Sequence, residues 1–128
     1  MTESDNIEFQ RATPVLRSGD YVRSRTFYAD KLGFAVVEEG GTPPRFGIFA
    51  RGRAVLFVDA WNGPPAPTSG GWQAYVHVDD VDAQCAACRA AGVEITRDVS
   101  DTVYGMREFE IADPDGNVIC FEIGRAHV

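Results

Sequence analysis

The chain has 128 residues, a length that allows one compact domain and excludes a two-domain enzyme. Its composition, 45% hydrophobic and 24% charged, is that of a protein with a buried core and excludes wholesale disorder. The longest apolar run, from Ala54 to Val58, is far shorter than the roughly 20 residues that a membrane-spanning helix needs. The net charge of −7, from 12 Lys and Arg against 19 Asp and Glu, argues against nucleic acid and favours cations as partners.

The first residues and the cysteines indicate the compartment. The start, from Met1 to Asn6, is acidic, and no apolar segment of a secretory signal follows it. Three cysteines, Cys85, Cys88 and Cys120, form an odd set. We therefore expect a cytoplasmic protein with free thiols. Cys85 and Cys88 fall inside a predicted helix rather than at its start, which favours a core position over redox chemistry.

Two segments have the pattern of a capped helix. Asp20 can cap a helix that Gly33 ends, and Asp79 or Asp80 can cap a helix that Gly92 ends. The second segment is rich in alanine, which favours helix. We therefore predict helices at residues 21–32 and 81–91.

One short strand precedes each predicted helix and three follow it. Pro14 marks the first strand as an edge strand or a hinge, because proline cannot donate to a strand ladder. Turns rich in Gly and Asp, such as the one from Asp113 to Asn117, separate the other strands. The predicted strands are residues 13–17, 34–39, 45–50 and 53–59 in the first half and 72–78, 93–97, 106–112 and 118–123 in the second.

Caps and turns of the first half recur about 60 residues later, which indicates a tandem duplication of a βαβββ unit. We predict one α+β domain at residues 13–124, with a first module at 13–59 and a second at 72–124. The intervening residues 60–71 are too rich in Pro and Gly for regular structure and form a linker. Residues 1–12 are expected to be a flexible tail, and residues 125–128 a second tail.

This order of elements resembles the vicinal-oxygen-chelate superfamily, which includes glyoxalase I, extradiol dioxygenases, fosfomycin-resistance transferases and bleomycin-resistance proteins. The resemblance covers residues 13–124 and rests on Phe27-Tyr28, Leu32-Gly33-Phe34 and the Asp113–Asn117 turn. Pro14-Val15-Leu16, residues 74–78 and residues 105–109 are most similar to the bleomycin-resistance branch. The resemblance implies a curved eight-stranded mixed sheet around a ligand groove, with the helices outside. It also implies a homodimer, in which the bleomycin-resistance branch exchanges its first strand.

In enzymes of this superfamily, His and Glu hold a divalent metal ion at four positions in the groove. Carried over to this chain, those positions hold Thr13, Leu56, Gln73 and Cys120. None is His or carboxylate, so this set lacks the ligands that a divalent ion needs. We therefore expect no metal ion and no cofactor. Without the ion, the chain lacks the Lewis-acid chemistry that the ion supplies in those enzymes.

A displaced metal site remains an alternative. Strand alternation places Glu122 on the same face as Cys120, and His77 on the same face as Gln73. Asp59 would close such a site from the first half. This alternative predicts a metal-dependent lyase, isomerase or dioxygenase.

The groove lining is the candidate binding site. Alternation turns one face of the second module's first and last strands inward and turns Trp72 toward the helix. Trp61 in the linker and Tyr104 before the seventh strand are candidates to stack on a planar or cationic ligand. The candidate ligand-binding residues are Leu56, Trp61, Gln73, Tyr75, His77, Tyr104, Cys120 and Glu122.

Each candidate also has a structural interpretation. Trp61 can pin the linker to the sheet, and Tyr75 and Tyr104 can pack as groove wall. His77 can be a satisfied core or interface histidine rather than a base, and Glu122 a solvated carboxylate.

These observations favour a metal-free protein that sequesters a small cationic or aromatic compound, as bleomycin-resistance proteins do. The alternatives are the metal-dependent enzyme above and a protein that only pairs with another chain.

Overall fold

The computed structural model describes residues 6–67 and 70–123, and it confirms two tandem βαβββ modules. Residues 1–5 of the predicted 1–12 tail, residues 68–69 of the linker, residue 124 and the predicted 125–128 tail lie outside the described residues. The first module contains β1 (Val15–Arg17), α1 (Tyr21–Arg25), the π-helix η2 (Thr26–Lys31), β2 (Ala35–Gly40), β3 (Phe46–Arg51) and β4 (Ala54–Asp59). The second contains β5 (Ala74–Val78), α2 (Val81–Ala90), β6 (Glu94–Asp101), β7 (Arg107–Ala112) and β8 (Val118–Ile123).

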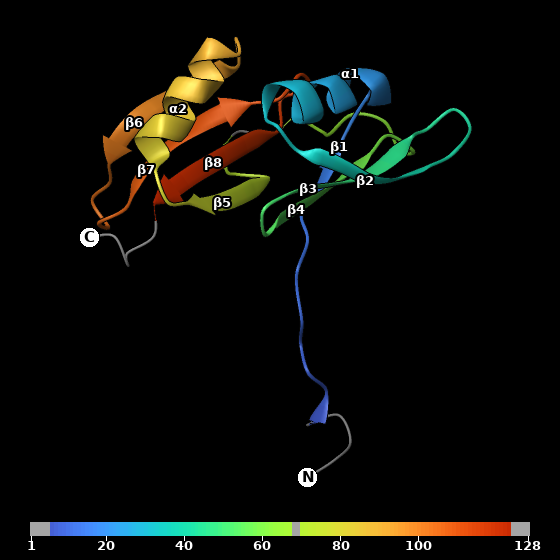
Figure 1. Cartoon of the computed structure of the whole chain (residues 1–128), viewed down its shortest axis with the longest axis horizontal. Coiled ribbons are helices and arrows are strands. Elements are labelled where there is room, and N and C mark those ends of the chain that lie inside the picture. Colours follow the sequence, from blue (N-terminus) through green and yellow to red (C-terminus); the bar gives the residue numbers. More distant parts are fainter. Residues whose placement is uncertain (1–5, 68–69, 124–128) are drawn as a thin grey trace.

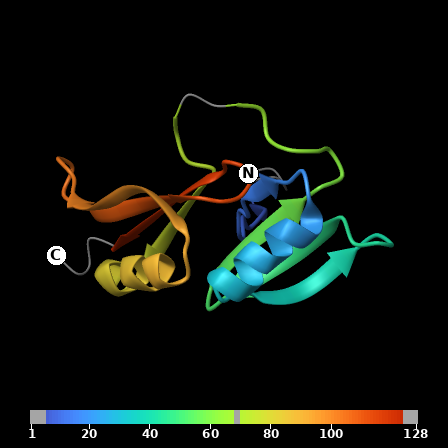
Figure 2. The same cartoon turned by 90° about the horizontal axis from the view of Figure 1, so that it is seen from above.

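The eight strands form two four-stranded mixed sheets, with the orders β1-β4-β3-β2 and β5-β8-β7-β6. The first strand of each module pairs in parallel with the last, and the other pairs are antiparallel. Each sheet carries its helix on one face, and the modules lie side by side (Figures 1 and 2). The α+β architecture is as predicted, with the strands divided between two sheets.

Both predicted helix caps are present. The Asp20 carboxylate accepts a hydrogen bond from the Arg23 amide at 3.1 Å, and Asp80 accepts one from Ala83 at 2.9 Å. The first helix widens into a π-helix, in which the Leu32 amide bonds the Phe27 carbonyl at 3.1 Å. This wider segment buries both Phe27 and the adjacent Tyr28.

The core lies between each sheet and its helix. Alternate residues of the strands face the helices, which explains the burial of Phe49 and Leu56 in the first module and of Phe109 and Phe121 in the second. The rings of Phe109 and Phe121 stack at 5.2 Å. Among the described residues, no helix has the length and apolar character to cross a membrane.

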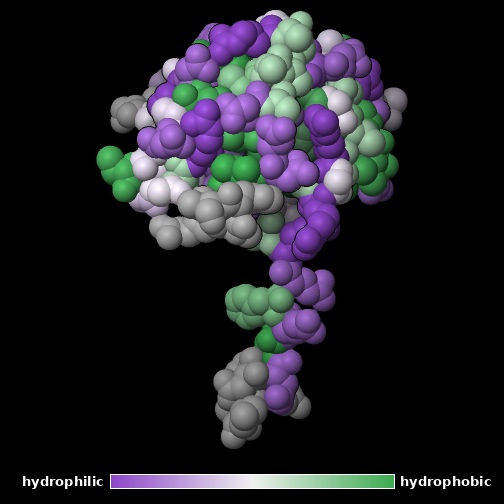
Figure 3. Space-filling view, turned by 60° about the vertical axis from the view of Figure 1, so that its left-hand side comes forward, coloured by the Kyte–Doolittle hydropathy of each residue, from purple (hydrophilic) through white to green (hydrophobic). Residues whose placement is uncertain are grey.

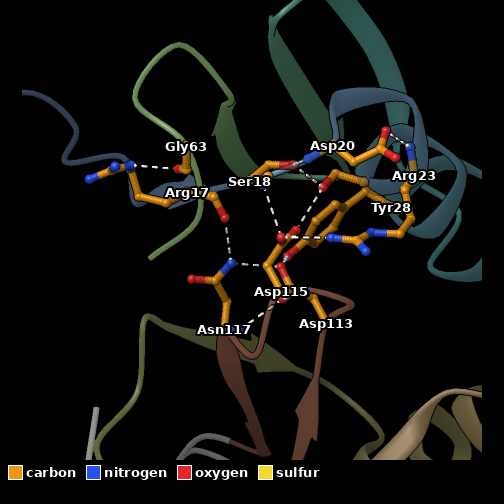
Figure 4. Close-up of polar contacts among 11 residues, drawn as sticks. Arg17, Ser18, Asp20, Arg23, Tyr28, Gly63, Asp113, Asp115 and Asn117 are labelled. Atoms are coloured by element: carbon orange, nitrogen blue, oxygen red, sulfur yellow. Dashed lines mark hydrogen bonds and ion pairs between the residues drawn. The ribbon is translucent and has the colours of Figure 1, made fainter. Parts of the chain in front are cut away.

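The turn between β7 and β8 joins the two modules through Asp115 (Figure 4). Its Oδ1 accepts a hydrogen bond from the Gly19 amide at 2.9 Å and pairs with the Arg23 guanidinium at 2.7 Å. Its Oδ2 accepts one from the Ser24 hydroxyl at 3.2 Å. The Asp115 side chain is 3% exposed, so these donors replace the water that the carboxylate loses.

A second set of bonds in the same turn involves Asn117. Its side-chain amide donates to the Arg17 carbonyl at 2.9 Å and to Asp113 Oδ2 at 2.8 Å. The same Asp113 oxygen accepts a hydrogen bond from Tyr28. The turn that carried the family resemblance therefore holds the modules in one arrangement.

Candidate functional site

A cavity of about 840 Å³ lies where the edges of the two sheets meet. Tyr75 and His77 of β5 line one side, and Arg53, in the turn between β3 and β4, lines another. Arg11, from the extended segment before β1, completes the lining. This segment leaves the body of the molecule as an arm (Figures 1 and 3). The volume is within the range of small-molecule sites.

The face of the second sheet that lies away from α2 borders this cavity, and we call it the acidic face. Strand register places Tyr75 beside Cys120, and Cys120 beside Glu110. It also places His77 beside Glu122, and Glu122 beside Glu108. Because side chains alternate along strands, these six residues share one face.

Glu108 is the most strongly bonded carboxylate of the acidic face. It is 1% exposed and accepts hydrogen bonds from Tyr104 at 2.6 Å, Tyr75 at 2.9 Å and Arg97 at 2.7 Å. Burial alone raises the pKa of the Glu108 carboxyl, but the three donors and the Arg97 charge outweigh it and lower that pKa. Glu108 is therefore a fixed negative charge near neutral pH.

Trp72 lies on the acidic face, and the prediction that it turns toward the helix was wrong. Its Nε1 donates to Glu110 at 2.9 Å, and its ring lies 4.6 Å from that of Tyr75. Strand alternation does not apply to Trp72 because β5 begins only at Ala74. The indole is 44% exposed and forms an open aromatic surface beside the carboxylates.

His77 and Glu122 form a pair between β5 and β8. His77 Nδ1 contacts Glu122 Oε1, whereas Glu122 Oε2 has no hydrogen-bond partner among the described residues. Glu122 is fully buried, so the alternative interpretation of it as a solvated carboxylate was wrong. The His77 side chain is 68% exposed, so this histidine lies at the cavity surface rather than in the core.

Leu56 borders the cavity, but its side chain is 2% exposed and packs in the core beneath the first module's helix. The position equivalent to Cys120 is Phe57, which pairs with Val15 as Cys120 pairs with Tyr75. The ring of Phe57 lies 5.3 Å from that of Phe46. Phe57 lies 63 residues before Cys120, whereas the turn glycines Gly52 and Gly116 are 64 residues apart. Counting from the turns therefore selects Leu56, and a shift of one residue places a side chain on the opposite face of its strand.

Trp61 lies away from the other candidates. Its ring stacks on the Arg45 guanidinium at 4.9 Å, and its amide donates to Asp59 at 2.8 Å. Asp59 ends β4, whereas Ala54, which borders the cavity, begins it. These contacts match the interpretation in which Trp61 pins the linker to the sheet.

Comparison with known proteins agrees with this geometry. The sequence model described as the glyoxalase/bleomycin resistance protein/dioxygenase superfamily matches residues 10–121. The chain belongs to this superfamily. No curated protein matches the chain.

Solved structures of superfamily members are similar over almost the whole chain. The bleomycin resistance determinant encoded on transposon Tn5 is 23% identical, with a TM-score of 0.76 over 91% of this chain and 99% of that one. The bleomycin-binding protein of Streptomyces verticillus, complexed with copper(II)-bleomycin, is 26% identical, with a TM-score of 0.72 over 93% and 99%. Lactoylglutathione lyase of Agrobacterium tumefaciens is 20% identical, with a TM-score of 0.72 over 91% and 95%. The fold is thus common to binding proteins and enzymes.

The residues present do not fit the metal ion of the superfamily's enzymes. Gln73 Oε1 accepts a hydrogen bond from the Val118 amide at 2.6 Å, so this oxygen is used in the contact between the residues before β5 and the start of β8. Asp59, at the far end of β4, does not complete a displaced site with His77 and Glu122. Within residues 6–67 and 70–123, no group of three His, Cys, Asp or Glu side chains is arranged to hold an ion.

The structure therefore brings together Tyr75, His77, Tyr104, Cys120 and Glu122, and it adds residues that were not predicted. Alternation along β7 puts Glu108 and Glu110 on one face, a signal that was present in the sequence. The positions of the other added residues depend on loop conformation, strand pairing and module packing, for which the sequence holds no local signal. These residues are Trp72, Arg97, Arg11 and Arg53.

Proposed function

We propose that this superfamily member binds and sequesters a small planar cation, as a metal-free protein of the bleomycin-resistance type. The observation that carries the proposal is the charge of the acidic face. Glu108, Glu110 and Glu122 lie there with a single arginine, Arg97, which pairs with the first two. A ligand cation at this face lies beside more negative than positive charge.

The aromatic residues of the same face supply the surface for a planar group. Trp72 and Tyr104 are 44% and 47% exposed, and Tyr75 lies against Trp72. Indole and phenol rings attract cations through their faces, and Trp is the strongest of them. The bleomycin-binding protein of Streptomyces verticillus, complexed with copper(II)-bleomycin, supports this class of ligand.

The experiment is a titration with a planar cationic dye, the methyl ester of a rhodamine, and with a neutral planar dye of similar size. We expect the cation to quench Trp72 fluorescence with a micromolar dissociation constant, and the neutral dye to bind much more weakly. Glu110→Gln keeps an acceptor for Trp72 but removes one charge, and we expect about fivefold weaker binding, ~1 kcal/mol.

Asp30→Asn is the control for Glu110→Gln. It removes one negative charge from an exposed position in η2, on the helix of the first module and outside the cavity lining, so binding should not change. The proposal fails if no planar cation binds more tightly than millimolar, or if both variants weaken binding equally.

We further propose that the binding groove is completed by a second copy of the chain, as a homodimer. The arm before β1 exposes Phe9 by 92% and Ile7 by 63%, and Val15 of β1 is 51% exposed. Exposed side chains of this kind on an extended segment are typical of an interface. Sedimentation equilibrium of the wild type and of Phe9→Ser tests this: we expect a dimer that the substitution weakens, and a monomeric wild type contradicts it.

The proposed setting is the cytoplasm, where sequestration would protect a cell from a toxic compound and so give antibiotic resistance. Free thiols at Cys85, Cys88 and Cys120 support a reducing compartment.

A further inference from the structure

The cavity between the modules has a basic lining in an acidic protein. The chain carries a net charge of −7, yet no Asp or Glu within residues 6–67 and 70–123 lines this cavity. Its charged side chains are Arg11 and Arg53, and the imidazole of His77 lies beside them. A second cavity of about 740 Å³ also borders on Arg53 and His77, but Asp79 and Asp80 are part of its lining. Of these two cavities, only the first has no described carboxylate in its lining.

Arg11 and Arg53 are unpaired in the described part of the chain. Neither makes a hydrogen bond, ion pair or ring contact with a described residue, and both are exposed. The other arginines in residues 6–67 and 70–123 all have partners; Arg97, for example, pairs with two carboxylates and Arg45 stacks on Trp61. Two guanidinium groups thus border one cavity with their donors available.

A guanidinium group binds oxyanions by its geometry. Its planar donors match the two oxygens of a carboxylate or the oxygens of a phosphate, and such charge-assisted bonds are stronger than neutral ones. The cavity meets the acidic face at Tyr75 and His77, which belong to both. A ligand that extends from the acidic face into the cavity therefore passes from negative to positive surroundings.

We propose that this cavity is an oxyanion subsite, in which Arg11 and Arg53 bind a carboxylate or similar group of the ligand. The ligand class is then a planar cation that also carries an anionic group. This statement about the ligand rests on the proposed function, whereas the subsite itself rests only on the cavity and its two arginines.

The test compares two dyes that differ in one group: a rhodamine with a free benzoate and the methyl ester of the same rhodamine. Both carry the same planar cation, so only the free acid presents an oxyanion. We expect the free acid to bind the wild type about tenfold more tightly than the ester. Arg11→Gln and Arg53→Gln should each reduce this ratio by weakening the binding of the free acid, and the double variant should bring it to one.

Arg45→Gln is the matched control. It removes the same charge from an exposed arginine that stacks on Trp61, outside the cavity lining, and the ratio should remain tenfold. Equal binding of acid and ester by the wild type overturns the proposal, as does equal loss of discrimination in all three variants.

A titration with benzoate alone separates the two proposals. In NMR spectra we expect benzoate at millimolar concentration to shift the Nε–Hε signal of Arg53, which Arg53→Gln identifies, and to leave that of Arg45 in place. If neither dye binds but benzoate shifts this signal, the planar-cation function fails and the subsite stands. If the ester binds and benzoate leaves the Arg53 signal unmoved, the subsite fails and the function stands.

Discussion

The Tyr28 hydroxyl, in η2 of the first module, donates a hydrogen bond of 2.7 Å to Asp113 Oδ2 in the second. Tyr28 is fully buried and Asp113 is 6% exposed. Burial raises the pKa of Tyr28, and the neighbouring Asp113 charge raises it further, so the hydroxyl keeps its proton and remains a donor. The other Asp113 oxygen accepts the amides of Asp115 and Asn117. One carboxylate therefore both shapes a turn and ties it to the other module.

The first prediction concerns this bond. Tyr28→Phe leaves Asp113 Oδ2 with the Asn117 amide as its remaining described donor, and we expect a loss of about 1 to 3 kcal/mol in the free energy of unfolding. Urea unfolding at neutral pH measures it. Tyr21→Phe is the control, because its hydroxyl bonds the partly exposed Glu39 within the first module and should cost less than about 1 kcal/mol. A Tyr28→Phe protein as stable as the wild type contradicts the prediction.

The second prediction concerns acid stability. The pKa of Glu108 is lowered in the folded protein from its ordinary value of 4.5, since its donors outweigh burial. A lowered folded-state pKa contributes stability above the unfolded value, and this stability is lost as pH falls through the folded value. We therefore expect Glu108→Gln to be less stable than the wild type at neutral pH and its free energy of unfolding to vary less with pH below 4.5. Urea unfolding across this range would refute the idea if both proteins showed the same pH dependence.

Strand alternation was enough to predict the β8 part of the acidic face, because Cys120 and Glu122 lie two residues apart in a strand without bulges. The same rule applies to Glu108 and Glu110. Alternation did not reveal which face β4 presents, because that depends on the length of the turn before it.

Other parts of the site depend on contacts that a single sequence does not encode locally. Trp72 precedes β5 and donates a hydrogen bond to Glu110 in β7, a strand that follows α2 and β6 in the chain. Arg11 and Arg53 meet at one cavity only because the modules pack with their sheet edges together. Local patterns therefore predicted the modules well and the surface between them poorly.

The third prediction separates core from groove in β4. Leu56→Ala removes a side chain that is 2% exposed and should destabilise the protein by about 2 to 5 kcal/mol without changing dye affinity. Phe57 is only partly buried on the opposite face, so Phe57→Ala should cost less. Urea unfolding and dye titration of both variants test this assignment, which is refuted if Leu56→Ala proves the less harmful change.

The fourth prediction concerns thiol reactivity. Cys85, Cys88 and Cys120 are 4%, 1% and 0% exposed, and burial raises the pKa of Cys88 to about 11 and that of Cys120 to about 12. The thiolate is the reactive form, so a rise of roughly two pKa units alone slows reaction about a hundredfold. We expect an aromatic disulfide reagent at pH near 8 to label none of the three rapidly in the native protein and all three in urea. A native thiol that reacts at the unfolded rate would show that its helix or strand opens readily.

The fifth prediction uses two glycines on opposite strands of the β2–β3 hairpin, both close to its turn. A Cβ atom on Gly47 would collide with the Tyr21 hydroxyl and lie 2.7 Å from a ring carbon of Phe49. The Tyr21 hydroxyl is held at 2.6 Å by Glu39, so it cannot move without losing that bond. On Gly40 the corresponding atom would lie at an ordinary 3.9 Å from Phe46, with no unfavourable backbone angle. We therefore expect Gly47→Ala to lower the free energy of unfolding by about 1 to 3 kcal/mol and Gly40→Ala to change it little. Urea unfolding of the pair decides the matter, because equal losses would show that backbone freedom, not the space under Tyr21, requires glycine here.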